Sequence, residues 1–382
     1  LGGGKLAQQL LVGLGFAESD FDQPVGHFSG GWRIRLNLAQ CLMAPSDLML
    51  LDEELPDGSG MEFLEEINLR PSKPLVVLMG ESVDIGVTAM KEGAHDYLLK
   101  PFSNEQVEMT DVHSRLAHMD ELGVDVHVLY PTIFLSPKTR RPEVEVALYK
   151  SYNRWMAEIW GQAPERLKWA AMLPYMTMDT ALEEMHWAKE HGACAFFMHS
   201  VEGERRLSEP YFDPVYLEAT ALDLPMCIHA TSGNFTLFDM YSQDAGFSTF
   251  KLPVVGAFHD LLMKGVPSKY PDLRWGFVEV SAQWIPYALN DMELRFRKGS
   301  REWLGRDILK ENNMYVACQT ADDLSTILEC VGDDNIVIGS DYGHNDTSSE
   351  IEALRRIREN GDVSDSIVNK ILDDNARALY AL

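Results

Sequence analysis

The chain has 382 residues and a formal net charge of −26, from 59 Asp and Glu against 33 Lys and Arg. This charge argues against a nucleic-acid partner and against an anionic membrane surface, because both are bound through clustered Lys and Arg. Hydrophobic residues make up 46% and charged residues 24%, as in ordinary globular proteins, and the length allows about two or three domains. We therefore expect a soluble, acidic, cytoplasmic protein.

Cysteine usage and targeting signals agree with that expectation. The five cysteines form no CxxC pair and are odd in number, which favours a reducing compartment. No apolar run is long enough to span a bilayer. The first residues, LGGGKLAQQ, carry no signal-peptide pattern and no initiator Met, so we expect a fragment or an internal piece of a longer protein.

Residues 1–52 predict two helices followed by a strand. The second helix begins after Gly31 and is amphipathic, and LMLL is a short buried strand that ends at Asp52. FSGGWRIRLNLAQ and LMLLDE resemble the signature and Walker B motifs of duplicated, soluble ATP-binding cassette proteins. ATP hydrolysis needs a G-x-x-x-x-G-K-[ST] phosphate loop, and LGGGKL lacks its spacing. We therefore expect no ATPase activity from this fragment.

Residues 53–108 predict alternating strands and helices in a doubly wound arrangement, with strands at PLVVLM and DYLLK. LLDEELPDGSG and AMKEGAHDYLLKPF resemble a response-regulator receiver. The resemblance implies Asp52 as phosphoacceptor and Lys100 as a contact for the phosphoryl group. The acidic pair that holds magnesium is not visible, and Gly80 stands where a hydroxyl is expected, so phosphotransfer is not favoured.

Residues 109–382 continue with larger units, in which seven predicted strands each stand beside a helix. The strands are expected at 125–131, 167–174, 193–200, 224–231, 273–280, 313–320 and 335–341. Eight such strands would close a (β/α)8 TIM-like barrel, in which catalytic residues lie at the carboxyl ends of the strands. The fold class expected is therefore α/β, with an incomplete barrel preceded by doubly wound βαβ fragments. We also consider that the upstream βαβ units supply the missing strand.

This segment resembles the amidohydrolase superfamily, in the branch of aminocarboxymuconate-semialdehyde decarboxylase. The motifs that carry the resemblance are HMDELGVDVHVLYP, YNRW, LPMCIHA, FVEVSAQWIPYAL and IVIGSDY, in family order. The resemblance implies a metal-dependent hydrolase, or a lyase of the decarboxylase type, that acts on a small carboxylated ring or semialdehyde. It also implies a divalent metal, usually zinc, at the barrel mouth, where the ion polarises the substrate.

The family pattern transfers to three residues near the metal. It implies His229 and Asp341 as metal ligands, Asp341 also as proton acceptor, and Glu279 as base or third ligand. Glu279 stands where the decarboxylases have a His.

Three further residues are implied to contact the substrate. Trp284 would shape the pocket, His199 would face the substrate, and His344 would reach the rim. The small molecule is the one partner that the resemblance supplies; a homodimer is compatible with it, but no residue pattern indicates an interface.

One ligand pair of the family is missing. The chain has eleven histidines, and none stands two residues from another, so the His-x-His after the first strand is absent. A catalytic zinc needs about three protein ligands, so two would hold it weakly or not at all. Two alternatives therefore stay open: a catalytically inert mosaic, or a receiver-type phosphoacceptor and binding module.

Overall fold

The computed structural model describes five short strands and Leu64 within residues 48–99. It then describes residues 112–382, apart from 242–245, 300–302, 304, 343–349 and 362. The chain divides into two compact units, Leu1–Pro101 and Phe102–Leu382. The three expected segments, 1–52, 53–108 and 109–382, stay predictions, because the structure does not test their boundaries.

The N-terminal unit contains a small parallel sheet. Its strands are β1 (Leu48–Asp52), β4 (Leu75–Gly80) and β5 (Asp96–Leu99), in the order β1-β4-β5. A short hairpin joins β2 (Glu54–Leu55) to β3 (Gly58–Ser59). The parallel pairing confirms the doubly wound fragment. These strands form a sheet of their own, and the hypothesis that the upstream units complete the barrel stays a prediction.

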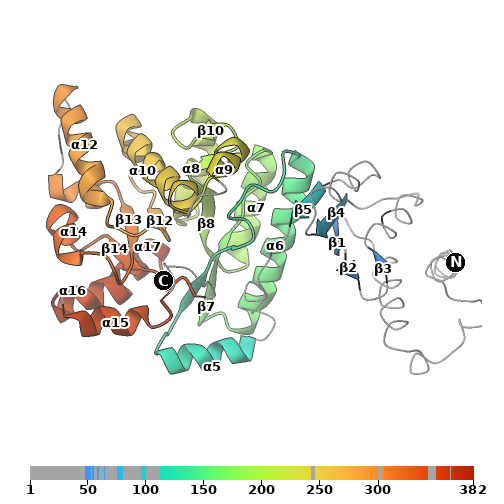
Figure 1. Ribbon diagram of the computed structural model, residues 1–382, viewed down its shortest axis with the longest axis horizontal. Coiled ribbons are helices and arrows are strands. Elements are labelled where there is room, and N and C mark those ends of the chain that lie inside the picture. Colours follow the sequence, from blue (N-terminus) through green and yellow to red (C-terminus); the bar gives the residue numbers. More distant parts are fainter. Residues whose placement is uncertain are drawn as a thin grey trace, which may run out of the picture. The chain divides into compact units, whose positions relative to one another are not determined.

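The C-terminal unit is built on seven parallel strands, which are paired in the order β14-β13-β12-β11-β8-β7-β6 (Figure 1). They are β6 (His127–Leu129), β7 (Leu167–Ala171), β8 (Ala193–His199), β11 (Met226–His229), β12 (Trp275–Val278), β13 (Met314–Cys318) and β14 (Ile336–Ile338). Each of the seven strands predicted from the sequence is present, and neighbours in the sheet follow one another along the chain apart from the hairpin β9–β10 (Val201–Glu202 and Arg205–Arg206).

Helices follow the strands and flank the sheet (Figure 1). The longer ones are α5 (Val112–Leu122), α6 (Pro142–Gln162), α7 (Met178–Glu190), α8 (Asp213–Ala221), α10 (Leu252–Lys264), α12 (Ile285–Lys298), α14 (Leu324–Val331) and α15 (Ala353–Asn360). Shorter ones are α9 (Phe235–Tyr241), α11 (Val266–Lys269), α13 (Ile308–Glu311), α16 (Asp365–Asn369) and α17 (Asn375–Tyr380).

The sheet is curled into an incomplete (β/α)8 barrel, as predicted. β6 pairs with β7 and β14 pairs with β13, and among the described residues no eighth strand joins the outer edges of β6 and β14. The sheet is covered on both faces, since every residue of β8, β11, β12 and β13 is buried. Continuous apolar runs are expected for parallel strands buried in this way.

The longest helix, α6, shows how local sequence positions these elements. Pro142 occupies its first turn, where a missing N–H costs nothing. The negative charge of Glu143, in the same turn, interacts favourably with the positive end of the helix dipole. Val144, Leu148 and Tyr152 recur every four residues and are buried. Burying each such apolar side chain contributes about 1.5–3 kcal/mol.

The YNRW motif fixes α6 to the end of β7. The Asn153 amide donates to Met172 O at 2.9 Å, and Asn153 Oδ1 accepts from Met172 N at 3.0 Å. Glu184 of α7 accepts from Asn153 Nδ2 at 3.0 Å and from both terminal nitrogens of Arg154. A buried amide thus holds the main chain just beyond β7, close to the site end of the sheet.

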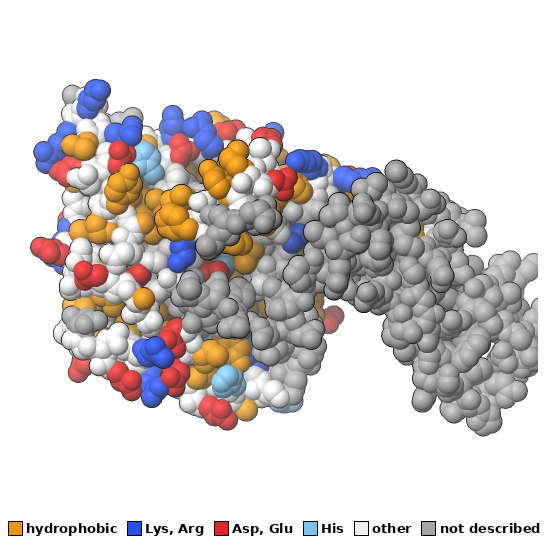
Figure 2. Space-filling view, viewed as in Figure 1, with side chains coloured by type: hydrophobic (Ala, Val, Ile, Leu, Met, Phe, Trp, Pro, Cys, Tyr) orange, Lys and Arg blue, Asp and Glu red, His pale blue; other side chains and the backbone are white. Residues whose placement is uncertain are grey.

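The visible face of the C-terminal unit mixes acidic and basic side chains with hydrophobic ones (Figure 2). On α12, Arg295 pairs with Asp291 and Arg297 pairs with Glu293, both at i, i+4 spacing. Within the part of the chain that the structure describes, no helix has the length and apolar character needed to cross a membrane.

Gly276 in β12 tests the packing under the site. A Cβ on Gly276 would lie 2.8 Å from Cys227 Sγ, inside a fully buried layer. We expect Gly276→Ala to lower the free energy of unfolding by about 1–3 kcal/mol, because overpacking a rigid core forces side chains off their rotamers. Urea unfolding followed by Trp fluorescence measures the change.

Gly256→Ala is the matched control, because Gly256 lies in α10 and has nothing within 4 Å of a built Cβ. This control should be neutral or stabilising by up to about 1 kcal/mol. Equal urea midpoints for the two variants would contradict the packing described here.

Candidate active site

Parallel pairing brings the carboxyl ends of three strands together. His199 ends β8, His229 ends β11, and Glu279 directly follows β12. His229 is in register with His199 on one side and with Val278 on the other. Because β8, β11 and β12 run in one direction, these polar residues share one edge of the sheet. Asp341 follows β14 by three residues.

The central contact is a close pair of an imidazole and a carboxylate. His229 Nε2 lies 3.0 Å from Glu279 Oε2, with side-chain exposures of 6% and 16%. Glu279 has a φ of 61°, a left-handed conformation that is uncommon for a residue with a side chain. Such backbone strain persists only where the surroundings impose it. The strand-to-loop turn therefore holds the Glu279 carboxylate against the imidazole.

Aromatic rings enclose His229. The ring of Phe197 stacks on it at 5.5 Å between centroids, and the ring of Tyr130 lies at 5.3 Å. The Tyr130 hydroxyl is 2.9 Å from the hydroxyl of Tyr380 in α17. Burial raises the pKa of the Tyr130 hydroxyl, so both phenols stay protonated at neutral pH.

A cavity of about 540 Å³ opens beside this pair. Its polar lining comes from six separate segments and includes Arg115, His127, His229, Glu279, Gln319 and Asp341. The cavity therefore brings together His229, Glu279 and Asp341, three of the residues predicted from the sequence.

The cavity follows the open side of the sheet. Consecutive residues line it on both edge strands, 126–133 around β6 and 337–342 around β14. Side chains alternate between the two faces of a strand, so an unbroken run of lining residues means that the cavity runs along the strand edges. It therefore occupies the space that an eighth strand would fill in a closed barrel.

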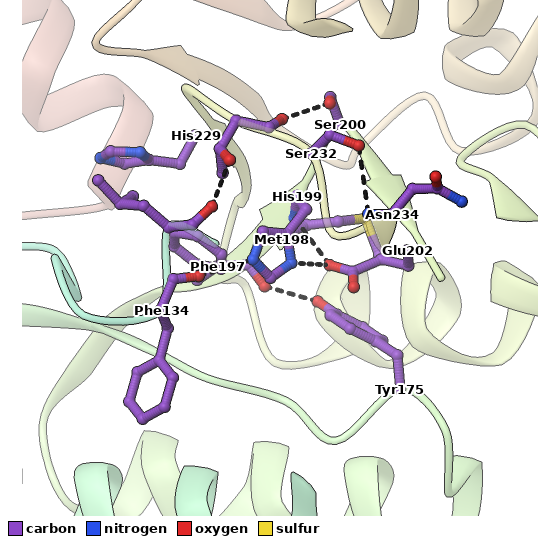
Figure 3. A network of polar contacts seen from close by, with 12 residues as sticks. Phe134, Tyr175, Phe197, Met198, His199, Ser200, Glu202, His229, Ser232 and Asn234 are labelled. Carbon is purple, nitrogen blue, oxygen red and sulfur yellow. Dashed lines mark hydrogen bonds and ion pairs between the residues drawn. The ribbon is translucent and has the colours of Figure 1, made fainter. Parts of the chain in front are cut away.

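His199 lies beneath the site in a polar cluster (Figure 3). Its Nδ1 is 2.9 Å from Glu202 Oε1, its Nε2 donates to Phe134 O at 2.8 Å, and its side chain is 3% exposed. Burial lowers the pKa of His199, but the Glu202 carboxylate and the Phe134 carbonyl outweigh burial and raise it. Both ring nitrogens are thus engaged, and His199 is not among the cavity-lining residues of the described chain.

Glu145 of α6 is a second buried acid near this cluster. Its Oε2 accepts a hydrogen bond from Met176 N at 2.9 Å, and the residue is only 5% exposed. Burial raises the pKa of Glu145 from 4.5 to about 8, the Met176 hydrogen bond opposes this, and the charge of Glu202 adds to it. Glu145 is therefore largely protonated at neutral pH.

The remaining predicted residues lie elsewhere or outside the described part. Trp284 donates from Nε1 to Ser281 O at 2.7 Å, packs on Phe258, and does not line the cavity as described. His344 and Lys100 lie outside the described residues. Asp52 is the last residue of β1, and its side chain is not described. Their roles stay predictions.

A divalent metal fits the described residues poorly. His229 and Glu279 offer one imidazole nitrogen and one carboxylate oxygen 3.0 Å apart. A catalytic zinc takes about three protein ligands. Within the described ranges, no three His, Cys, Asp or Glu side chains gather closely enough to hold an ion.

Sequence reasoning missed most of the cavity wall, including Arg115, Tyr130, Gln319 and Tyr380. Tyr130 directly follows β6 and Gln319 directly follows β13, a position that could have marked them. Arg115 and Tyr380 lie on helices, and no spacing in the sequence points to the cavity.

Comparison with known proteins agrees with this architecture. The fold defines an incomplete (β/α)8 barrel with its polar residues at the carboxyl edge of the sheet. Residues 107–382 match the family described as Amidohydrolase, which is more than half of the chain, and the chain belongs to this family.

Two solved structures share the fold. An amidohydrolase from Mycobacterium avium subsp. paratuberculosis superposes with a TM-score of 0.62 at 20% identity, covering 71% of this chain and 73% of that one. The 5-carboxyvanillate decarboxylase of Novosphingobium aromaticivorans, with bound manganese, gives 0.61 at 18% identity, covering 80% and 97%.

The upstream resemblances are also found. Residues 36–110 match the response regulator receiver domain. The probable ATP-binding protein YheS of Haemophilus influenzae is 66% identical over 47 residues, which are 12% of this chain. The chain spans only about 7% of the length of that relative.

Glu145 predicts a specific pH dependence of stability. The folded state keeps its proton up to about pH 8, whereas the unfolded chain releases it near 4.5, so this group costs stability as the pH rises between these values. Glu145→Gln keeps an oxygen for the Met176 N–H and carries no charge. We expect the variant to exceed wild type in stability by about 1–3 kcal/mol at pH 8, and by steadily less as the pH falls toward 4.5.

Urea unfolding at several pH values measures this difference, with Glu143→Gln as the control. Glu143 lies on the same helix but is half exposed, so its substitution should show no such growth with pH. A difference between Glu145→Gln and wild type that stays constant from pH 5.5 to 8 would show that Glu145 titrates normally.

Proposed function

We propose that the C-terminal unit is a decarboxylase of a small aromatic carboxylic acid, which binds in the cavity beside His229 and Glu279. The observation that carries this proposal is the 3.0 Å contact between His229 Nε2 and Glu279 Oε2 in the wall of a cavity of about 540 Å³. The amidohydrolase family and the decarboxylase among the similar structures support it. Cavities of about 300–1,000 Å³ suit small ligands.

The walls suit a planar, apolar ring. Leu129, Val278, Ile338 and Met156 line the cavity together with the ring of Tyr130. Burial of a ring among such side chains supplies binding energy of about 25 cal/mol per Å² of apolar surface. The same walls exclude water, which strengthens the electrostatic effect of the polar groups among them.

The proposed chemistry is proton transfer to carbon. In the proposal, one proton is shared between His229 Nε2 and Glu279 Oε2, which lie 3.0 Å apart. In the proposed reaction the pair gives a proton to the ring carbon that bears the carboxylate. The bond from that carbon to the carboxyl group then breaks, its electrons stay with the ring, and CO2 leaves. Water restores the proton to the pair, so atoms and charge balance.

No step of this proposal passes through a metal, because the described residues supply two of the about three ligands that a catalytic zinc needs. Added metal is therefore a variable of the assay and not a part of the proposed mechanism. The assay is therefore run after chelation and after addition of zinc or manganese.

Loss of the shared proton should abolish turnover. We expect Glu279→Gln to lower kcat by about 10²-fold or more, the usual contribution of general acid–base catalysis. The assay follows CO2 and the decarboxylated phenol from a panel of hydroxybenzoates. In D2O the product should carry deuterium at the carbon that lost the carboxylate.

Glu218→Gln is the matched control, since Glu218 pairs with His186 at 2.9 Å on the surface, with 30% and 58% of the two side chains exposed. It should leave kcat unchanged. Absence of CO2 from the whole panel, with and without metal, would contradict the proposal and favour an inert barrel.

A second candidate concerns the N-terminal unit alone. We infer a receiver-type phosphoacceptor at Asp52, because β1 ends at this residue and the parallel order β1-β4-β5 agrees with the last three strands of the doubly wound order 2-1-3-4-5. The match to the receiver family supports it.

Acetyl phosphate with magnesium should then add one phosphoryl group to the wild-type chain and none to Asp52→Asn, as measured by intact mass. Asp120→Asn, an exposed acid of the other unit, is the control and should still be modified. An unmodified wild-type chain would contradict a phosphoacceptor role.

A further inference from the structure

A second group of polar side chains borders the same cavity, on elements other than those of His229 and Glu279. It consists of Arg115 and His118 on α5, His127 on β6, and Tyr342, which follows Asp341. Three of them, Arg115, His127 and Tyr342, line the cavity. The proposed proton transfer uses none of the four.

The ring of Tyr342 holds this group together. Arg115 Cζ lies 3.8 Å from the centroid of the ring, which is within cation–π range. The rings of His118 and His127 each meet it edge-on at 5.4 Å, and His118 Nδ1 is 2.5 Å from the Tyr342 hydroxyl. The contacts connect the end of β14 with α5 and β6 across the open side of the sheet.

His127 has an unused hydrogen-bonding atom. Its Nδ1 is buried and has no hydrogen-bond partner among the residues that the structure describes. Leaving a buried polar group unsatisfied costs about 1–3 kcal/mol, and such groups in folded proteins call for an explanation. A ligand in the cavity would supply the missing partner.

The charges around His127 favour an anion. Burial, with a smaller contribution from the positive charges of Arg115 and His118, lowers the pKa of His127 to about 4. The ring is therefore neutral at pH 7 and can donate one N–H. Arg115, a residue that is 8% exposed, places a positive charge beside His127, and this charge attracts an anion in the cavity.

Acidic residues face the cavity as well. Glu279 and Asp341 line it from the ends of other strands, and both repel an anion. Of the cavity-lining segments named here, the one formed by Arg115 and His127 is therefore where a carboxylate is best accommodated. The apolar side chains of β6 next to His127 would then contact the ring that carries the carboxylate.

We propose that Arg115 and His127 form a carboxylate-binding subsite of this cavity, in which the His127 imidazole donates a hydrogen bond to the carboxylate and Arg115 supplies the charge. His127 is thus a specificity-determining residue that selects a ring acid over its uncharged analogue. The inference extends the proposed decarboxylase, because it names the group of the substrate that is recognised, but binding tests it without turnover.

Isothermal titration of the full chain compares benzoate with benzamide, which has the same ring and no charge. We expect wild type to bind benzoate at least about tenfold more tightly, a difference of about 1.4 kcal/mol. His127→Phe keeps an aromatic ring and removes both nitrogens. This variant should lose the preference for benzoate and keep its affinity for benzamide.

His127→Asn provides the rescue, because its side-chain N–H lies close to the position of Nδ1; it should keep most of the preference for benzoate. His186→Phe is the control, since His186 is exposed on α7 and far in sequence from the cavity-lining segments. It should bind both compounds as wild type does. Circular dichroism and thermal melting establish that each variant is folded.

Two results overturn the subsite. One is equal affinity of the wild type for benzoate and benzamide, which needs no variant to fold. The other is an unchanged preference for benzoate in folded His127→Phe. The two proposals can fail separately. A preference for benzoate that depends on His127, without CO2 release from the hydroxybenzoates, supports the subsite and contradicts the decarboxylase. CO2 release together with a benzoate preference that does not depend on His127 supports the decarboxylase and contradicts the subsite.

Discussion

Parallel hydrogen bonding among β8, β11 and β12 is the constraint on which the site depends. It aligns the last residues of three strands that are 30 to 50 residues apart in the chain, so that the turn after β12 carries Glu279 to His229. The left-handed backbone at Glu279 is tolerated because the buried strand β12 precedes the turn and the buried residues Val280 and Ala282 follow it. The pair is thus a product of sheet register rather than of local sequence.

The open side of the sheet decides the character of the cavity. In a closed barrel, β6 and β14 would be separated by another strand. Here the cavity lies along their edges, and Tyr342 connects them through contacts with His118 and His127. The sequence also lacks the His-x-His pair that the family resemblance implies after the first strand. The open side of the sheet therefore explains the position of the cavity, and the absent pair explains the incomplete ligand set.

The buried cluster around His199 has a different role. Its ring ties the end of β8 to Glu202 and to the main chain at Phe134, and a Cβ at Gly233 would lie 3.0 Å from its Nδ1 (Figure 3). Buried ion pairs contribute little net stability but can specify one arrangement of loops. We infer that this cluster orders the loops beneath the site, since its ring nitrogens are both occupied by protein groups.

The sequence by itself determined the seven strands, their parallel rhythm and the family, because apolar runs and helix periodicity are local properties that survive wherever the segment is placed. It also marked His229, Glu279 and Asp341, since they stand at or near the ends of predicted strands and match the family pattern. Only the tertiary structure decided that both ring nitrogens of His199 contact Glu202 and Phe134. It also decided that Arg115 and Tyr380 reach the cavity from helices. These outcomes depend on long-range packing, which brings together residues that no spacing in the sequence relates.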